Sequence, residues 1–165
     1  MLASASVSDR LARRPAPAAP AALALVALVL AGCGLVSTSG PPATPADFPG
    51  IASELSRRGL LVDDIVSGDA GCDDQELART AIRFTAQGLD QDEPTPIYLY
   101  IFRNREAFER NRTAVDACLP SYVTDADDLG LIEASPFVLA GPGPWAPEFA
   151  AELRRSLTQL AGTGG

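Results

Sequence analysis

Few side chains in this 165-residue chain could do chemistry, and their types narrow the reactions open to it. Histidine and lysine are both absent, so all 13 basic residues are arginine. Without them the chain cannot build a Ser-His-Asp or Cys-His nucleophile, a histidine-containing zinc site or a lysine Schiff base. The glycines form neither a G-x-G-x-x-G fingerprint nor a phosphate-binding loop. Three cysteines and a surplus of carboxylates remain.

One group of carboxylates begins like a calcium loop. In the stretch DADDLG, residues 125–130, Asp125 and Asp127 stand at positions one and three of that loop. Position five is Leu129 and position twelve is Pro136, where the EF-hand pattern requires oxygen ligands. Because these ligands are missing, we interpret the stretch as a surface loop and expect neither a metal nor a cofactor.

A second group of carboxylates surrounds Cys72 and consists of Asp69, Asp73, Asp74 and Glu76. Two of them could act as general acid and base, as the carboxylate pair of a glycosidase does. Most Asp-rich loops, however, are solvated caps and turns. We therefore predict that the chain is not an enzyme, and keep a carboxylate-dependent hydrolase as an alternative.

The first cysteine follows an apolar run near the start of the chain. Three arginines, at positions 10, 13 and 14, precede 11 apolar residues at 21–31. A helix of that length covers about 17 Å, well short of the ~30 Å hydrocarbon core of a bilayer. Residues 1–32 are therefore predicted to be a signal peptide and not a spanning helix.

The stretch Leu30-Ala31-Gly32-Cys33 at the end of this run resembles the lipobox of bacterial lipoproteins. The resemblance covers the first 33 residues and implies that the Cys33 thiol is acylated, with chains such as palmitate, and becomes the first residue of the mature protein. Each buried acyl CH2 contributes about 0.8 kcal/mol to anchoring. The implied location is the extracytoplasmic face of the cell membrane. A secreted protein with a chance cysteine is the alternative.

Charge narrows the class of partner. Removal of residues 1–32 takes away three arginines and one aspartate, leaving ten arginines, 20 acids and a net charge of −10. Nucleic acids and anionic headgroups require clustered positive charge, so we expect no nucleic-acid partner. The absence of lysine beside abundant Ala, Gly and Pro is similar to the amino-acid usage of high-GC Gram-positive bacteria.

Two cysteines remain, Cys72 and Cys118, in a chain predicted to be exported. Exported thiols normally pair, so we predict a disulfide between them. Closing this 46-residue separation would restrict the unfolded chain by about 4 kcal/mol in the loop-entropy model. Two buried free thiols or a redox pair are the competing interpretations.

The region after Cys33 divides into a tether and one domain. Residues 33–45, CGLVSTSGPPATP, are rich in Ser, Thr, Gly and Pro and lack apolar periodicity, which predicts a flexible tether. Residues 46–162 are long enough for one hydrophobic core and too short for two. Residues 163–165 are predicted to be a disordered tail.

Periodicity predicts that this domain is α+β, with the order α-β-β-β-α-β-α and one antiparallel sheet of about four strands covered by helices. The expected elements are a helix at 46–59, strands at 60–68, 78–88 and 95–103, a helix at 104–120, one bent or two short strands at 130–141 and a helix at 147–162. A short helical turn is expected before the second strand.

Details of these segments predict their positions. Asp63 and Asp64 suggest that the first strand lies at an edge or on a solvated face. The third strand alternates apolar residues on both faces and is therefore expected at the centre of the sheet. Asp47 and Asn104 are expected to cap the helices that follow them.

The stretch GPGPWAP, residues 141–147, carries the single tryptophan, Trp145, between rigid turns. An aromatic side chain on a stiff loop is a good contact residue for a partner protein or a glycan. Packing of Trp145 on the core before the last helix is an equally strong interpretation. Tyr98, Tyr100 and Phe102 pose the same choice, and a covered sheet face explains them more simply than a ligand groove.

Together these features predict a lipid-anchored protein of the cell envelope whose domain binds or scaffolds an unknown envelope protein or glycan without catalysis. One alternative is a small hydrolase acting on envelope glycans through carboxylates. Another is an accessory solute-binding lipoprotein of a transporter, although such receptors usually have two lobes.

Overall fold

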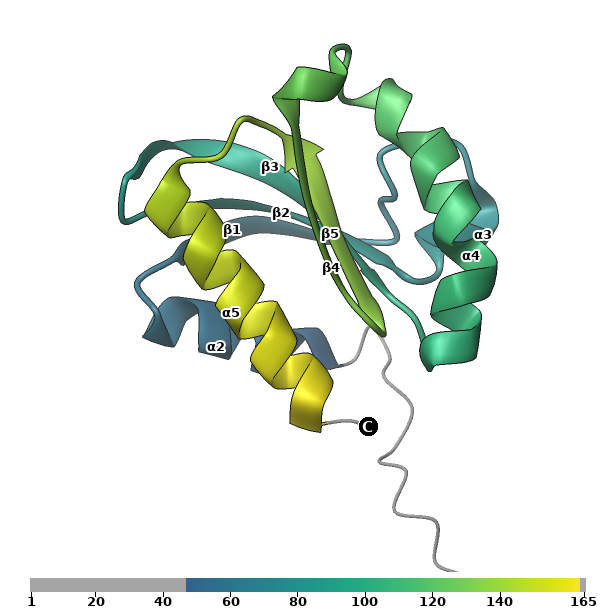
Figure 1. Cartoon of the computed structure of the whole chain (residues 1–165), viewed down its shortest axis with the longest axis horizontal. Coiled ribbons are helices and arrows are strands. Elements are labelled where there is room, and N and C mark those ends of the chain that lie inside the picture. The colour runs from purple at the N-terminus through teal and green to yellow at the C-terminus, as the bar shows by residue number, and fades with distance from the viewer. Residues whose placement is uncertain (1–46, 164–165) are drawn as a thin grey trace, which may run out of the picture. The chain divides into compact units, whose positions relative to one another are not determined.

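A computed structural model describes residues 47–163 of the chain. Its helices and strands alternate in short segments along that range (Figure 1). In chain order they are α2 (Phe48–Arg57), β1 (Leu61–Ser67), α3 (Gln75–Ala78), β2 (Ala81–Gly88), β3 (Gln91–Ile101), α4 (Arg105–Cys118), η3 (Leu119–Ser121), η4 (Ala126–Asp128), β4 (Leu129–Ala134), β5 (Phe137–Pro142) and α5 (Pro147–Thr163).

The five strands form one antiparallel sheet in the order β1-β2-β3-β5-β4. The α+β class, the single sheet and the central position of β3 are thereby confirmed. β1 lies at one edge of the sheet, as its two aspartates suggested, and β4 lies at the other. The long strand β3 pairs with both β2 and β5, so it lies inside the sheet, and its residues 97 and 99–101 are buried.

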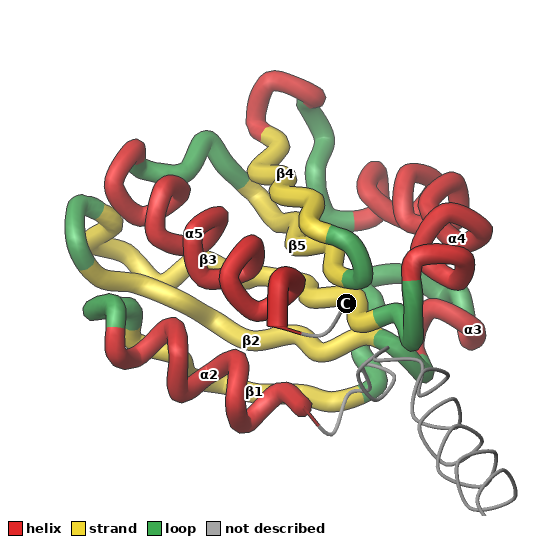
Figure 2. Tube along the Cα trace, turned by 60° about the horizontal axis from the view of Figure 1, so that its bottom comes forward, coloured by secondary structure: helices red, strands yellow, loops and turns green. Residues whose placement is uncertain are grey.

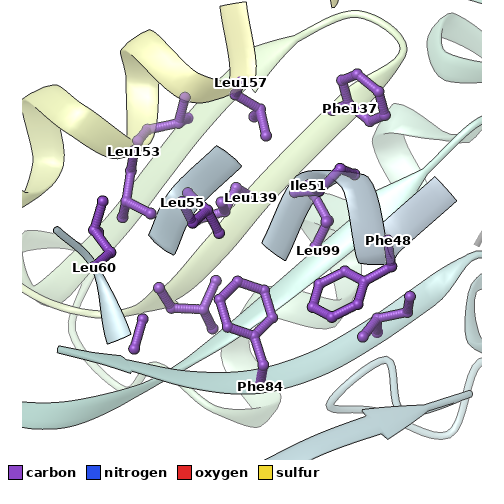
Figure 3. Packing of buried hydrophobic residues seen from close by; sticks show 14 of the residues in the cluster. Phe48, Ile51, Leu55, Leu60, Phe84, Leu99, Phe137, Leu139, Leu153 and Leu157 are labelled. Carbon is purple, nitrogen blue, oxygen red and sulfur yellow. The ribbon is translucent and has the colours of Figure 1, made fainter. Parts of the chain in front are cut away.

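The first face of the sheet packs against α2 and α5, which run across it side by side (Figure 2). Their apolar side chains interdigitate with those of the strands, as the close view of Figure 3 shows. The labelled members of this core are Phe48, Ile51, Leu55, Leu60, Phe84, Leu99, Phe137, Leu139, Leu153 and Leu157. The members from α2 and the members from α5 follow one another at intervals of three or four residues, so the apolar side chains of each helix lie on one face.

The second face is covered by α3 and α4, which lie together at one end of the sheet in both views (Figures 1 and 2). Tyr100 of β3 and Phe102, which directly follows this strand, are buried there in one cluster with Val115 and Cys118 of α4. This second packed layer confirms that the aromatic side of β3 is covered by structure.

Polar contacts hold the helices in place. The Asn104 side chain accepts a hydrogen bond from Ala107 N at 2.9 Å, which confirms the predicted cap of α4. Arg58, at the end of α2, pairs with buried Glu54 at 2.7 Å and with Glu152 of α5 at 3.2 Å. These carboxylates raise the pKa of the Arg58 guanidinium, with the hydrogen bond to Glu54 as the largest cause.

Three details differ from the expectations. Of the two alternatives for residues 130–141, the structure has the two short strands, so the sheet has five strands where about four were expected, because Pro136 cannot donate to a ladder and the chain turns between Ala134 and Phe137. The Asp47 side chain makes no capping hydrogen bond to α2. Helix α5 reaches Thr163, one residue beyond its expected end.

Candidate functional site

The helices α3 and α4 cover only part of the second sheet face. On the uncovered part, the side chains of β1 and β2 that point away from the α2–α5 core reach the surface. Val62 pairs with Ala86, and both pack on that core, so their neighbours in each strand project from the opposite face. We call this area the β1–β2 surface. It comprises Leu61, Asp63, Val66, Arg83, Thr85 and Gln87.

β1 carries several large apolar side chains that are exposed. Among the described residues only four large hydrophobic side chains are exposed, and three of them lie on β1: Leu61 at 61%, Ile65 at 54% and Val66 at 39%. Scattered single hydrophobics are normal on a protein surface, but three on one seven-residue edge strand are an unusual concentration, and we call Leu61, Ile65 and Val66 the apolar patch on β1. These three side chains belong to neither hydrophobic core, so packing of the interior does not explain why they are apolar.

A pocket of about 310 Å³ lies beside the same strand. Residues 61–64 of β1, residues 85–87 of β2, Ser56 and Pro94 line it. Its size is at the lower end of the range for small-molecule sites, and three of its lining residues, including both aspartates, are exposed on β1. The pocket is large enough to take one side chain of a partner protein.

Negative charge accompanies the patch. Asp63 and Asp64 are adjacent and exposed, and no carboxylate–arginine pair involves either of them within residues 47–163. Arg83, the nearest cation in the ladder, donates to Asp69 at 2.9 Å. Within residues 47–163, neither Asp63 nor Asp64 thus has an arginine within ion-pair distance.

A bulge interrupts β1 at these acids. The register shifts between Asp63 and Val66, so two residues of β1 oppose one residue of β2. Asp64 adopts a positive φ of 50°, a conformation that Asp and Asn tolerate better than most residues. The bulge and the acids are both devices by which natural proteins restrict pairing at a sheet edge.

The predicted disulfide is confirmed. Cys72, in the loop after β1, bonds to Cys118 at the end of α4, with 5.6 Å between their Cα atoms. This bond joins the loop to the helix that covers the second face.

All three tyrosines lie next to this bond. The rings of Tyr98 and Tyr122 stack with centroids 4.2 Å apart. Tyr100 Oη donates to the Ala70 carbonyl at 2.8 Å and lies 3.2 Å from Tyr122 Oη. Burial raises the pKa of Tyr122 to about 12 and raises that of Tyr100 further. These tyrosines hold the loop against the sheet.

The acids around Cys72 serve the same loop. Asp69 accepts from Gly71 N at 2.9 Å and from Arg83. Asp74 caps α3 by accepting from Glu76 N and Leu77 N. Their hydrogen bonds agree with the interpretation of the group as caps and turns.

The loop at 125–130 is also explained by local structure. The Asp125 side chain accepts from Asp127 N at 3.0 Å and caps η4. Within residues 47–163, no group of three or more His, Cys, Asp or Glu side chains is placed to hold a metal ion.

Trp145 is half-buried and packs on the protein. Its Nε1 donates to the Pro142 carbonyl at 2.8 Å, and its ring meets Phe149 edge to face with centroids 6.3 Å apart. A Cβ on Gly130 would lie 2.2 Å from the indole, so the glycine leaves room for the ring. This geometry matches the packing interpretation. Contact of Trp145 with a partner stays a prediction.

Several predictions fall outside the described residues: the signal peptide 1–32, the lipobox with Cys33, the tether 33–45 and the end of the tail. In the described part, no helix is both long and apolar enough to cross a lipid bilayer.

Comparison with known proteins identifies no relative. No family model, no curated protein and no solved structure matches the chain.

The residues that the sequence singled out as functional candidates, Cys72, Cys118 and Trp145, thus lie in the packed part of the domain. The β1–β2 surface was missed as a site. The feature of the sequence that could have indicated it is the composition of β1, where two acids separate Leu61 and Val62 from Ile65 and Val66.

Proposed function

We propose that this chain is a lipid-anchored protein of the cell envelope whose domain binds or scaffolds another envelope protein without catalysis. The observation that carries the binding role is the apolar patch on β1. Leu61, Ile65 and Val66 are exposed beside a pocket of about 310 Å³ and belong to neither hydrophobic core. The lipobox resemblance at Cys33 supports the anchor.

The contacts of the acids support binding over hydrolysis. A glycosidase needs two carboxylates that face each other across the scissile bond, one of them with a raised pKa. Asp69 and Asp74 instead accept backbone hydrogen bonds that shape the loop at 69–74.

The anchor is tested by the mass of the purified full-length protein after expression in a lipoprotein-processing bacterium. We expect a chain that begins at diacylated Cys33 and fractionates with the membrane. The Cys33→Ala variant should keep its signal peptide or be released from the membrane. An unmodified Cys33 in the wild-type protein would contradict the lipid anchor.

The binding role is tested by photocrosslinking in living cells. A photoreactive benzoylphenylalanine replaces Ile65 of β1 or, as a matched control, exposed Ala126 of η4 beside the opposite sheet edge. We expect a discrete crosslinked species from position 65 and none from position 126. Equal or absent crosslinking at both positions would refute binding through β1.

A further inference from the structure

The free side of β1 points to one kind of partner, an inference that rests on the proposed binding function. β1 pairs with β2 on one side, and no described residue pairs with its other side. Such an edge presents unpaired N–H and C=O groups that can accept another extended chain. The exposed side chains Leu61, Ile65 and Val66 lie along it. Because the recognition groups are backbone groups in extended form, the partner is a protein segment and not a glycan.

The charge on β1 selects among protein segments. Asp63 and Asp64 have no cation partner in residues 47–163, since Arg83 donates to Asp69. A second copy of β1 placed antiparallel on this edge would bring four carboxylates together, and like charges on facing strands are destabilising. A segment with an arginine or lysine gains the opposite interaction. The same acids that oppose self-pairing therefore favour a basic partner.

The pocket gives the basic side chain a place. Residues 61–64 line it: residues 61–63 belong to the regular part of the edge and Asp64 is the first residue of the bulge, so this part of the edge and both acids adjoin one cavity. A lysine or arginine side chain has an apolar stem and a charged end. Leu61 and Pro94 can contact the stem while Asp63 and Asp64 contact the charge.

We propose that β1 binds, as a sixth strand of the sheet, an extended segment of a partner protein that carries a basic residue between apolar ones. The basic side chain enters the pocket beside β1 and pairs with Asp63 and Asp64. The segment pairs with residues 61–63, which precede the bulge.

The test is a titration of the isotope-labelled full-length protein in detergent micelles, followed by NMR of its backbone amides. The probe is the peptide acetyl-TVTVRVTV-amide, and the comparison peptide has glutamate in place of arginine. We expect chemical-shift changes centred on residues 61–64, and a Kd about tenfold lower for the arginine peptide, as for two exposed ion pairs gained in place of like-charge contacts. N-methylation of alternate peptide bonds in the arginine peptide should abolish binding.

Matched variants separate charge from fold. Asp63→Asn with Asp64→Asn should reduce the preference for arginine to less than about twofold. Asparagine also tolerates the positive φ at position 64. The control, Asp127→Asn with Asp128→Asn, removes two adjacent exposed acids beside β4 at the other edge and should keep the tenfold preference.

Each remaining outcome overturns the inference. If neither peptide shifts the β1 amides while position 65 still crosslinks in cells, the domain binds a partner of other chemistry and the proposed function stands. Shifts at β1 that depend on protein concentration without peptide would assign the edge to a second copy. If both experiments fail, the proposed binding function fails with the inference.

Discussion

Gly71 precedes the disulfide-bonded Cys72, and its backbone lies close to two tyrosine rings. Its φ is +74°, and a Cβ at this position would lie 2.6 Å from Tyr122 and 2.8 Å from Tyr98. Only glycine meets both requirements, because other residues are strained at positive φ and need the space of the two rings. At the scale of single residues, the packing of the Cys72 loop on the second face of the sheet therefore requires a glycine at position 71 beside the tyrosine rings.

Replacing this glycine should destabilise the protein. For Gly71→Ala we expect a loss of roughly 2–3 kcal/mol in the free energy of unfolding, from backbone strain and overpacking. The measurement is urea denaturation followed by circular dichroism. The control is Gly50→Ala in α2, where a Cβ meets nothing within 4 Å, and it should leave stability equal or raise it by up to about 1 kcal/mol. Equal effects of the two substitutions would contradict this account.

The tyrosines predict a dependence of stability on alkaline pH. Burial raises the pKa of Tyr122 from 10.0 to about 12, so the folded protein holds this proton more tightly than the unfolded chain does. The contribution is complete below pH 10 and is lost as the pH rises from 10 towards 12. Urea denaturation across this range checks it, and Tyr122→Phe should make the decline less steep. Native tyrosines that all titrate near pH 10 in ultraviolet absorbance would disprove the shift.

At the scale of elements, the turn between β2 and β3 fixes the start of α5. Asp90 in this turn accepts hydrogen bonds from Glu148 N at 2.9 Å and Phe149 N at 2.8 Å. These two N–H groups lack partners within the helix, because they belong to its first turn. The hydrogen bond from Glu148 N is the largest cause that lowers the pKa of Asp90. A residue far away in the sequence thus supplies the cap.

The cap predicts how stability responds to acid. Because the folded-state pKa of Asp90 lies below 3.8, its contribution is present above that pH and is lost as the pH falls through the lowered value. Asp90→Ala should lower the thermal midpoint at neutral pH and weaken the further loss in acid. Asp92→Ala, which removes a charge from the same hairpin, is the control. Identical midpoints for the two variants would rule out the capping role.

At the scale of the whole molecule, the sheet is covered on both faces by different means. On the first face α2 and α5 bury a large apolar core. On the second face a smaller apolar cluster lies under α4. The disulfide between Cys72 and Cys118 links the loop after β1 to the end of this helix. The cross-link spans 46 residues and therefore restricts much of the unfolded domain.

Loss of the disulfide should lower the stability of the whole domain. Cys72→Ala with Cys118→Ala is expected to reduce the free energy of unfolding by about 4 kcal/mol, the loop-entropy value for this separation. Urea denaturation of the double variant measures the loss, and the wild-type protein under reducing conditions should show a similar one. A change of less than about 1 kcal/mol would show that packing alone holds α4.

Local patterns were sufficient for most elements and for some positions. Alternating apolar residues in β3 predicted a central strand, and Asp63 with Asp64 predicted an edge or a solvated face for β1. The patterns left residues 130–141 as one bent strand or two short strands, because a proline break is compatible with a bend and with a hairpin. Only the pairing of Ala134 with Phe137 decided for the hairpin.

The sequence by itself determined the α+β class, the identity of most helices and strands and, through the two remaining cysteines, one tertiary contact. These follow from periodicity and from the chemistry of single residue types, both of which are local. The tertiary structure alone decided which part of the second face α4 leaves open, how Trp145 packs over Gly130 and where the pocket beside β1 lies. These features depend on which surfaces meet across long separations in the chain, and no local pattern carries that information.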